Sequence, residues 1–148
     1  MAILSRTAIA GAVLLALPSF AFAATYYDQV RRFAPKLVQE KGAKKVCAIY
    51  QDDEFGLEVL RGAEAGLKTI GMELVEKTSF KRAATDFSSQ VARMKSAGCD
   101  FVVLGTIIRE PIGTIGEARK TGFNPTFLGT SASYTDLIHK LGGKAMDG

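Results

Sequence analysis

The stretch of sequence that decides the fold is Lys45-Val46-Cys47-Ala48-Ile49-Tyr50-Gln51-Asp52-Asp53-Glu54-Phe55-Gly56. Its first half is a short apolar run with charged residues beside it, which is typical of a strand buried on both faces. Its second half is a polar turn, after which apolar residues recur at helical spacing. A helix is expected over residues 55–70, with an apolar face formed by Leu57, Leu60, Ala63 and Leu67.

The same strand, turn and helix pattern continues on both sides of this stretch. An amphipathic helix is expected over residues 26–41, weakened by Pro35 and ended by Gly42. Further strands are expected at 72–78, 101–104 and 126–128, and further helices from Thr85 or Asp86 to Gly98, at 111–120 and at 134–141. Strands that alternate with helices require right-handed crossovers and a parallel sheet. The sequence therefore predicts an α/β fold, a three-layer sandwich with a mostly parallel doubly wound sheet.

This topology indicates where a ligand would bind. Open parallel sheets bind ligands in the crevice beyond the carboxyl ends of their strands. The loops at 51–56, 105–111 and 129–134 meet at that edge, and each leads into a helix whose free N–H groups favour anions or carbonyl oxygens. The candidate ligand-binding residues in these loops are Asp53, Phe55, Thr106, Ile107, Ile108, Ser131 and Ser133.

The first 23 residues have the three parts of a signal peptide. Arg6 precedes an apolar run from Thr7 to Leu17, and a Pro18-Ser19 break leads to Ala21-Phe22-Ala23. We expect cleavage after Ala23, a periplasmic location, and a single ligand-binding lobe at residues 24–148. The alternative is an uncleaved anchor, although the apolar run reaches the roughly 20 residues of a spanning helix only if the break is counted.

Cys47 and Cys99 lie far apart in the sequence, and each begins a predicted strand. The first and third strands of a doubly wound sheet are usually neighbours, so a disulfide is geometrically possible. We expect two buried free thiols instead. The absence of a CxxC spacing and of a histidine cluster argues against a metal site.

The sequence lacks the residue patterns that would indicate several other functional classes. The formal net charge of +4 over 148 residues is too small to indicate nucleic-acid binding. No glycine-rich nucleotide motif occurs, and no cofactor is expected. Asp52 and Asp53 are expected to be solvated or helix-capping acids. A catalytic triad of Ser131, Asp136 and His139 would crowd into one turn and helix, whereas triads gather distant segments. The sequence therefore does not indicate an enzyme.

Several segments together resemble one family. They are Gly42-Ala43-Lys44-Lys45-Val46, Asp52-Asp53-Glu54-Phe55-Gly56, Thr85-Asp86-Phe87-Ser88-Ser89-Gln90-Val91, Cys99-Asp100-Phe101-Val102-Val103-Leu104-Gly105 and Gly122-Phe123-Asn124-Pro125. In order and spacing, residues 27–148 resemble the type I periplasmic solute-binding proteins of the leucine/isoleucine/valine-binding kind, which serve ABC transporters. The resemblance implies a two-lobed receptor that closes on a small molecule and delivers it to a membrane permease.

The resemblance covers much of the second lobe, and the first lobe has no counterpart in this sequence. Either the chain is a truncated relative, which we favour, or another polypeptide supplies the first lobe. An isolated lobe would expose apolar surface and self-associate. The alternative function is a secreted interaction module or a remnant without ligand capture.

The resemblance also indicates ligand chemistry. Phe55 stands where the family commonly has tyrosine, Ile107 and Ile108 stand in a loop that is often aromatic, and Ser131 stands where an acid would face the ligand ammonium. The family implies a branched-chain amino acid. The missing acid favours a small aromatic or apolar carboxylate held by apolar walls and hydroxyls.

Overall fold

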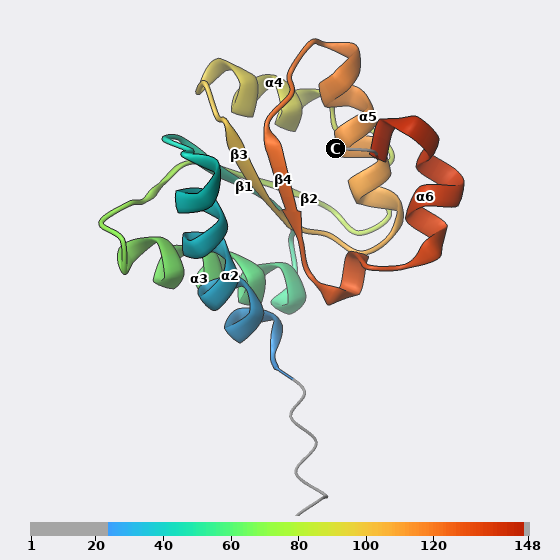
Figure 1. Cartoon of the computed structure of the whole chain (residues 1–148). Helices are drawn as coiled ribbons and strands as arrows, with labels where there is room; N and C mark the ends of the chain where they lie inside the picture. Colours follow the sequence, from blue (N-terminus) through green and yellow to red (C-terminus); the bar gives the residue numbers. More distant parts are fainter. Residues whose placement is uncertain (1–23, 147–148) are drawn as a thin grey trace, which may run out of the picture.

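The computed structural model describes residues 24–146 (Figure 1). The predicted signal peptide, residues 1–23, lies outside the described residues. The helices are α2 (Tyr26–Lys41), α3 (Glu54–Lys68), α4 (Ser88–Ser96), α5 (Arg109–Lys120) and α6 (Asp136–Gly142), with short 3-10 turns η2 (Ser131–Ser133) and η3 (Gly143–Met146). The strands are β1 (Val46–Gln51), β2 (Leu74–Phe80), β3 (Phe101–Gly105) and β4 (Thr126–Gly129).

The four strands form one parallel sheet in the order β2-β1-β3-β4. This order confirms the predicted α/β class and the expectation that the first and third strands are neighbours. Tyr50 at the end of β1 lies opposite Gly105 at the end of β3, so these two strands finish at the same edge. The sheet thus brings the chain segments that follow β1, β3 and β4 to one side of the molecule.

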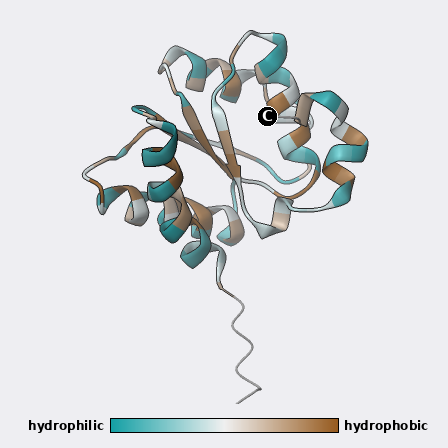
Figure 2. Ribbon diagram, in the orientation of Figure 1, coloured by the Kyte–Doolittle hydropathy of each residue, from teal (hydrophilic) through white to brown (hydrophobic). Residues whose placement is uncertain are grey.

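Helices cover both faces of the sheet, with α2 and α3 on one face and α4 and α5 on the other (Figure 1). Alternate residues of β1 and β3 enter two separate cores, and β3 is accordingly coloured as hydrophobic (Figure 2). The core under α2 and α3 takes Val46, Ala48, Phe101 and Val103. The core under α4 and α5 takes Cys47, Ile49, Val102 and Leu104.

The helices α2 and α3 pack closely because α3 carries glycines where the two backbones meet. A methyl group at Gly62 would lie 2.6 Å from the carbonyl oxygen of Tyr27, and one at Gly66 would lie 2.7 Å from that of Arg31. Both contacts are too short for any side chain. The start of α2 is therefore held directly against α3, close to the edge where the candidate site lies.

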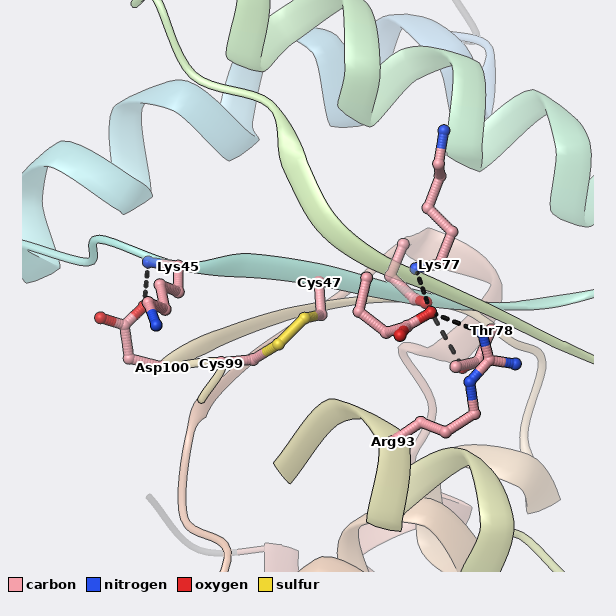
Figure 3. The surroundings of a disulfide bond; sticks show 9 residues. Lys45, Cys47, Lys77, Thr78, Arg93, Cys99 and Asp100 are labelled. Carbon is pink, nitrogen blue, oxygen red and sulfur yellow. Dashed lines mark hydrogen bonds and ion pairs between the residues drawn. A yellow bond between two sulfur atoms is a disulfide. The ribbon is translucent and has the colours of Figure 1, made fainter. Parts of the chain in front are cut away.

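The expectation of free thiols is wrong, because Cys47 and Cys99 form a disulfide (Figure 3). Their Cα atoms are 5.9 Å apart, within the usual range for a disulfide. The pairing of β1 with β3 brings Cys99, two residues before β3, beside the start of β1. Asp100 reinforces the same junction, since its carboxylate accepts hydrogen bonds from the backbone N–H groups of Lys44 at 2.8 Å and Lys45 at 2.9 Å.

Some element boundaries differ from those predicted. The helix α4 begins at Ser88 rather than at Thr85 or Asp86; Phe87 is its N-cap, and the Asp86 carboxylate accepts the Ser88 N–H at 2.9 Å. The helix predicted at 134–141 is α6, which begins at Asp136 with Thr135 as its N-cap, and the predicted loop before it contains the short turn η2, which Thr130 caps. Within residues 24–146, no helix combines the length and apolar character needed to cross a bilayer.

Candidate functional site

The three predicted loops follow β1, β3 and β4, which are adjacent strands of the sheet. Because the strands are parallel, all three loops lie at the carboxyl edge, as predicted. Two hydrogen bonds join parts of this edge that are distant in sequence. The Ser133 hydroxyl donates to the Thr106 carbonyl oxygen at 2.8 Å, and the Ser131 N–H donates to Gln29 Oε1 on α2 at 3.1 Å.

Asp53 is the N-cap of α3, which confirms the capping role expected for this acid. Its carboxylate accepts hydrogen bonds from the Gly56 N–H at 3.1 Å and from the Gln51 side-chain amide, and it pairs with Arg82 at 3.3 Å. Burial is the largest single influence and raises the pKa of Asp53, but the contacts with Gly56, Gln51 and Arg82 together hold it below its ordinary value. Asp53 is therefore an ionised capping residue whose charge is already balanced.

Phe55 is half-buried in the first turn of α3 and packs against the core beneath α2 and α3. Its ring meets the ring of Tyr26 edge to face, with centroids 4.9 Å apart and an angle of 88° between the planes. Edge-to-face contacts of this kind are favourable beyond their burial. Tyr26, at the start of α2, thus joins Phe55 in an aromatic pair.

The remaining loop residues differ in their exposure. Thr106 and Ser133 are buried and tie the loop after β3 to the loop after β4. Ile107 and Ile108 are half-buried, and no side chain caps α5 where it begins after Ile108. Ser131 is exposed. The loops therefore offer two partly open apolar side chains and one open hydroxyl, supported from below by buried polar residues.

A hollow of about 510 Å³ opens beside Ser131. It is lined by Ala24, Thr25, Tyr26, Gln29, Glu58 and Ser131. Of the predicted site residues, only Ser131 lines this hollow, although Phe55 adjoins it through the contact with Tyr26. The carboxylate of Glu58 accepts the Tyr27 N–H at 3.2 Å and so supports the start of α2.

Sequence reasoning missed the contribution of α2. Gln29 lies 102 residues before its hydrogen-bond partner Ser131, and no local pattern links the two. The adjacent aromatic residues Tyr26 and Tyr27, at the start of an otherwise charged helix, were the one available signal. No group of three or more His, Cys, Asp or Glu side chains suited to a metal ion occurs within residues 24–146.

Comparisons with known proteins agree on one family. The model of the periplasmic binding protein family matches residues 18–148. Among curated proteins, the Leu/Ile/Val-binding protein homolog 7 of Brucella abortus (strain 2308) is 29% identical over 106 residues, which make up 71% of this chain and 27% of that protein.

Solved structures show the same fold. A branched chain amino acid ABC transporter protein from Thermus thermophilus, with bound valine, superposes with a TM-score of 0.73 at 21% identity, covering 81% of this chain and 31% of that one. An ABC transporter solute binding protein from R. palustris, in complex with 4-hydroxybenzoate, gives a TM-score of 0.69 at 22% identity, covering 80% and 33%. The chain thus spans about a third of the length of the relatives it matches.

Proposed function

The chain belongs to the periplasmic binding protein family, and from this membership we propose that it serves as an extracytoplasmic solute-binding component of an ABC transporter. The family binds solutes and is not enzymatic, in agreement with the sequence-based expectation. The family match over residues 18–148 carries the proposal, and the fold shared with solute-binding structures supports it. Export by a cleaved signal peptide and delivery to a membrane permease are parts of the same proposal.

In this proposal the carboxyl edge of the sheet forms one wall of the ligand cleft. Phe55, Ile107 and Ile108 supply apolar surface, and Ser131 supplies a hydroxyl. Asp53, Thr106 and Ser133 hold the loops in place, since their polar groups are engaged within the protein or buried. A wall with much apolar surface and few polar groups suits a small molecule with an apolar or aromatic body.

The ligand is a branched-chain amino acid or a small aromatic carboxylate. Two structures with the same fold support this choice, because the Thermus thermophilus protein contains bound valine and the R. palustris protein contains 4-hydroxybenzoate. In a hinged receptor, ligand capture comes from closure of two lobes around the ligand. One lobe contacts only one side of a ligand, so we expect this chain by itself to bind more weakly than a full-length relative.

Thermal unfolding of the purified chain tests the proposal. We would measure Tm with L-valine, L-leucine, benzoate and 4-hydroxybenzoate, each at several concentrations. A ligand that binds only the folded state raises Tm as its concentration increases. We expect one chemical class to raise Tm and Phe55→Ala to remove the effect. Phe33→Ala, which changes an exposed ring on α2, is the matched control and should leave the effect intact. No shift with any of the four compounds would contradict the proposal.

One observation favours the interaction-module alternative. Phe33, at 54% exposure, lies beside Leu128 and Gly129 of the edge strand β4, and Tyr134 at 90% and Leu141 at 64% are exposed apolar side chains in the segment that follows the strand. An open strand edge with apolar neighbours is a surface on which another chain can pack. Analytical ultracentrifugation would show self-association if this alternative holds, and a monomer at all concentrations would contradict it.

A further inference from the structure

The hollow beside Ser131 is lined by three parts of the chain that hydrogen bonds hold together. The side-chain amide of Gln29 donates to the Ala24 carbonyl oxygen at 2.9 Å and accepts the Ser131 N–H at 3.1 Å, so the start of α2 is joined to the loop after β4. Glu58 of α3 accepts the Tyr27 N–H at 3.2 Å. The walls of the hollow are therefore fixed by contacts within the lobe.

Few of the polar groups that line the hollow are left to meet a ligand. Both ends of the Gln29 amide are engaged. The Thr25 hydroxyl accepts the Asp28 N–H at 3.1 Å and donates to the Asp28 carboxylate at 3.0 Å. The remaining side-chain groups are the second oxygen of the Glu58 carboxylate and the hydroxyls of Tyr26 and Ser131.

These groups give the hollow a negative character. Among residues 24–146, Glu58 is the only charged side chain that lines it, and no lysine or arginine contributes to its wall. Glu58 is half-buried and belongs to none of the ion pairs in this part of the chain. A carboxylate accepts hydrogen bonds but donates none, and burial favours pairing it with a cation. Aromatic rings such as that of Tyr26 also attract ammonium groups. The hollow thus suits a cationic group and has no side-chain cation for a carboxylate.

We propose that the hollow binds the ammonium group of a small primary amine, with Glu58 as its charged partner and the Ser131 hydroxyl as a further acceptor. This inference rests on the proposed solute-binding function and selects an amino acid from the two ligand classes named there. The Tyr26 ring lines the hollow and contacts Phe55 of the proposed apolar wall. A ligand with its ammonium group in the hollow can therefore place an apolar side chain against that wall.

Three compounds that share the isobutyl group of leucine test the site. L-leucine has an ammonium group and a carboxylate, 3-methylbutylamine has the ammonium group alone, and 4-methylpentanoate has the carboxylate alone. We would obtain Kd for each from the rise of Tm of the purified chain with ligand concentration. We expect L-leucine and 3-methylbutylamine to bind about tenfold more tightly than 4-methylpentanoate, because only they give Glu58 a charged donor.

Variants assign the effect to the hollow. The amide oxygen of Glu58→Gln can still accept the Tyr27 N–H, but the charge is lost, so Kd for 3-methylbutylamine should rise about tenfold. Glu64→Gln is the matched control, because it removes the same charge from α3 at a carboxylate outside the hollow, which pairs with Lys77 at 2.8 Å. Its Kd should equal that of the wild type. Ser131→Ala should raise Kd about threefold and serves if Glu58→Gln does not fold.

The N-terminus of the exported chain is a second possible cation for Glu58. Cleavage after Ala23 would give Ala24, which lines the hollow, a free α-ammonium group. We would therefore compare the chain that begins at Ala24 with the same chain acetylated at that residue, and we expect 3-methylbutylamine to bind both. Binding only after acetylation would show that Ala24 already balances Glu58, and it would overturn the proposal.

Two further outcomes would overturn this inference and leave the solute-binding function standing. One is binding of 4-methylpentanoate that is as tight as that of 3-methylbutylamine, and the other is an unchanged Kd in Glu58→Gln. No rise of Tm with any of the three compounds would also overturn it. The proposed function would fail with it only if benzoate and 4-hydroxybenzoate have no effect either.

Discussion

The two edges of the sheet are built differently. At the amino edge, where the strands begin, the disulfide between Cys47 and Cys99 and the carboxylate of Asp100 join β1 to β3 (Figure 3). At the carboxyl edge, where the strands end, a hollow opens beside Ser131. The amino edge is thus closed by covalent and hydrogen bonds between strands, whereas the carboxyl edge is the one at which the proposed binding loops lie.

The largest expected effect comes from removing the disulfide. Cys47→Ala combined with Cys99→Ala should lower the free energy of unfolding by about 4 kcal/mol, because the bond closes a long loop in the unfolded chain. Denaturant unfolding of the oxidised chain and of the double variant measures the difference. Ligand-induced shifts in Tm should persist in the variant, since the bond is at the edge remote from the site. A loss below about 1 kcal/mol would contradict the role assigned to the amino edge.

A smaller effect is expected from removing Asp100, whose hydrogen bonds also join β1 to β3 at the amino edge. Asp100→Ala removes the acceptor of two backbone N–H groups and should lower the free energy of unfolding by about 2 kcal/mol. Glu40→Ala is the matched control, because Glu40 forms only an exposed pair with Lys36 at 3.9 Å and should cost about 0.5 kcal/mol or less. Equal decreases in the free energy of unfolding of Asp100→Ala and Glu40→Ala would show that the hydrogen bonds of Asp100 do not stabilise the amino edge.

The smallest effect concerns Asp53 at the carboxyl edge. Asp53→Asn keeps a capping oxygen but loses the charge, and at pH 7 it should cost about 1 kcal/mol. The folded state holds the pKa of Asp53 below its ordinary value, so the charge stabilises the protein above the unfolded pKa, and this contribution is lost as pH falls through the folded pKa. The difference between wild type and variant should therefore shrink below about pH 4.

Asp53→Ala separates the capping hydrogen bond from the charge. It should cost more than Asp53→Asn, and the gap between the two variants should not change with pH. Urea unfolding between pH 3 and 7 measures both comparisons. A wild-type advantage over Asp53→Asn that stays constant down to pH 3 would show that the charge of Asp53 does not contribute to stability.

Local sequence patterns predicted most of the fold because they are set by short-range chemistry. The helix at 26–41 was predicted with the bounds that the structure shows, since Thr25 and Gly42 cap its ends. The order of the elements implied a parallel sheet with the first and third strands adjacent. The start of the next helix was predicted less well: Thr85 or Asp86 was expected to cap it, but Phe87 is the N-cap of α4 and Asp86 instead accepts the Ser88 N–H.

The candidate site was predicted less completely. The rule that parallel strands end at one edge located all three loops correctly. It could not show that Thr106 and Ser133 are buried, because their burial depends on how two loops pack against each other. Nor could it reveal Gln29 and Glu58, which come from helices whose local sequence indicates only an amphipathic surface.

The sequence by itself determined the α/β class, the helix and strand pattern, and the edge at which the three candidate loops lie, because these follow from hydrophobic periodicity, capping residues and strand direction. Only the tertiary structure decided that Cys47 and Cys99 are bonded, that α2 lines the hollow beside Ser131, and that Thr106 and Ser133 are buried against each other. Those features arise from contacts between residues far apart in the chain, and such contacts leave no periodic pattern in a single sequence.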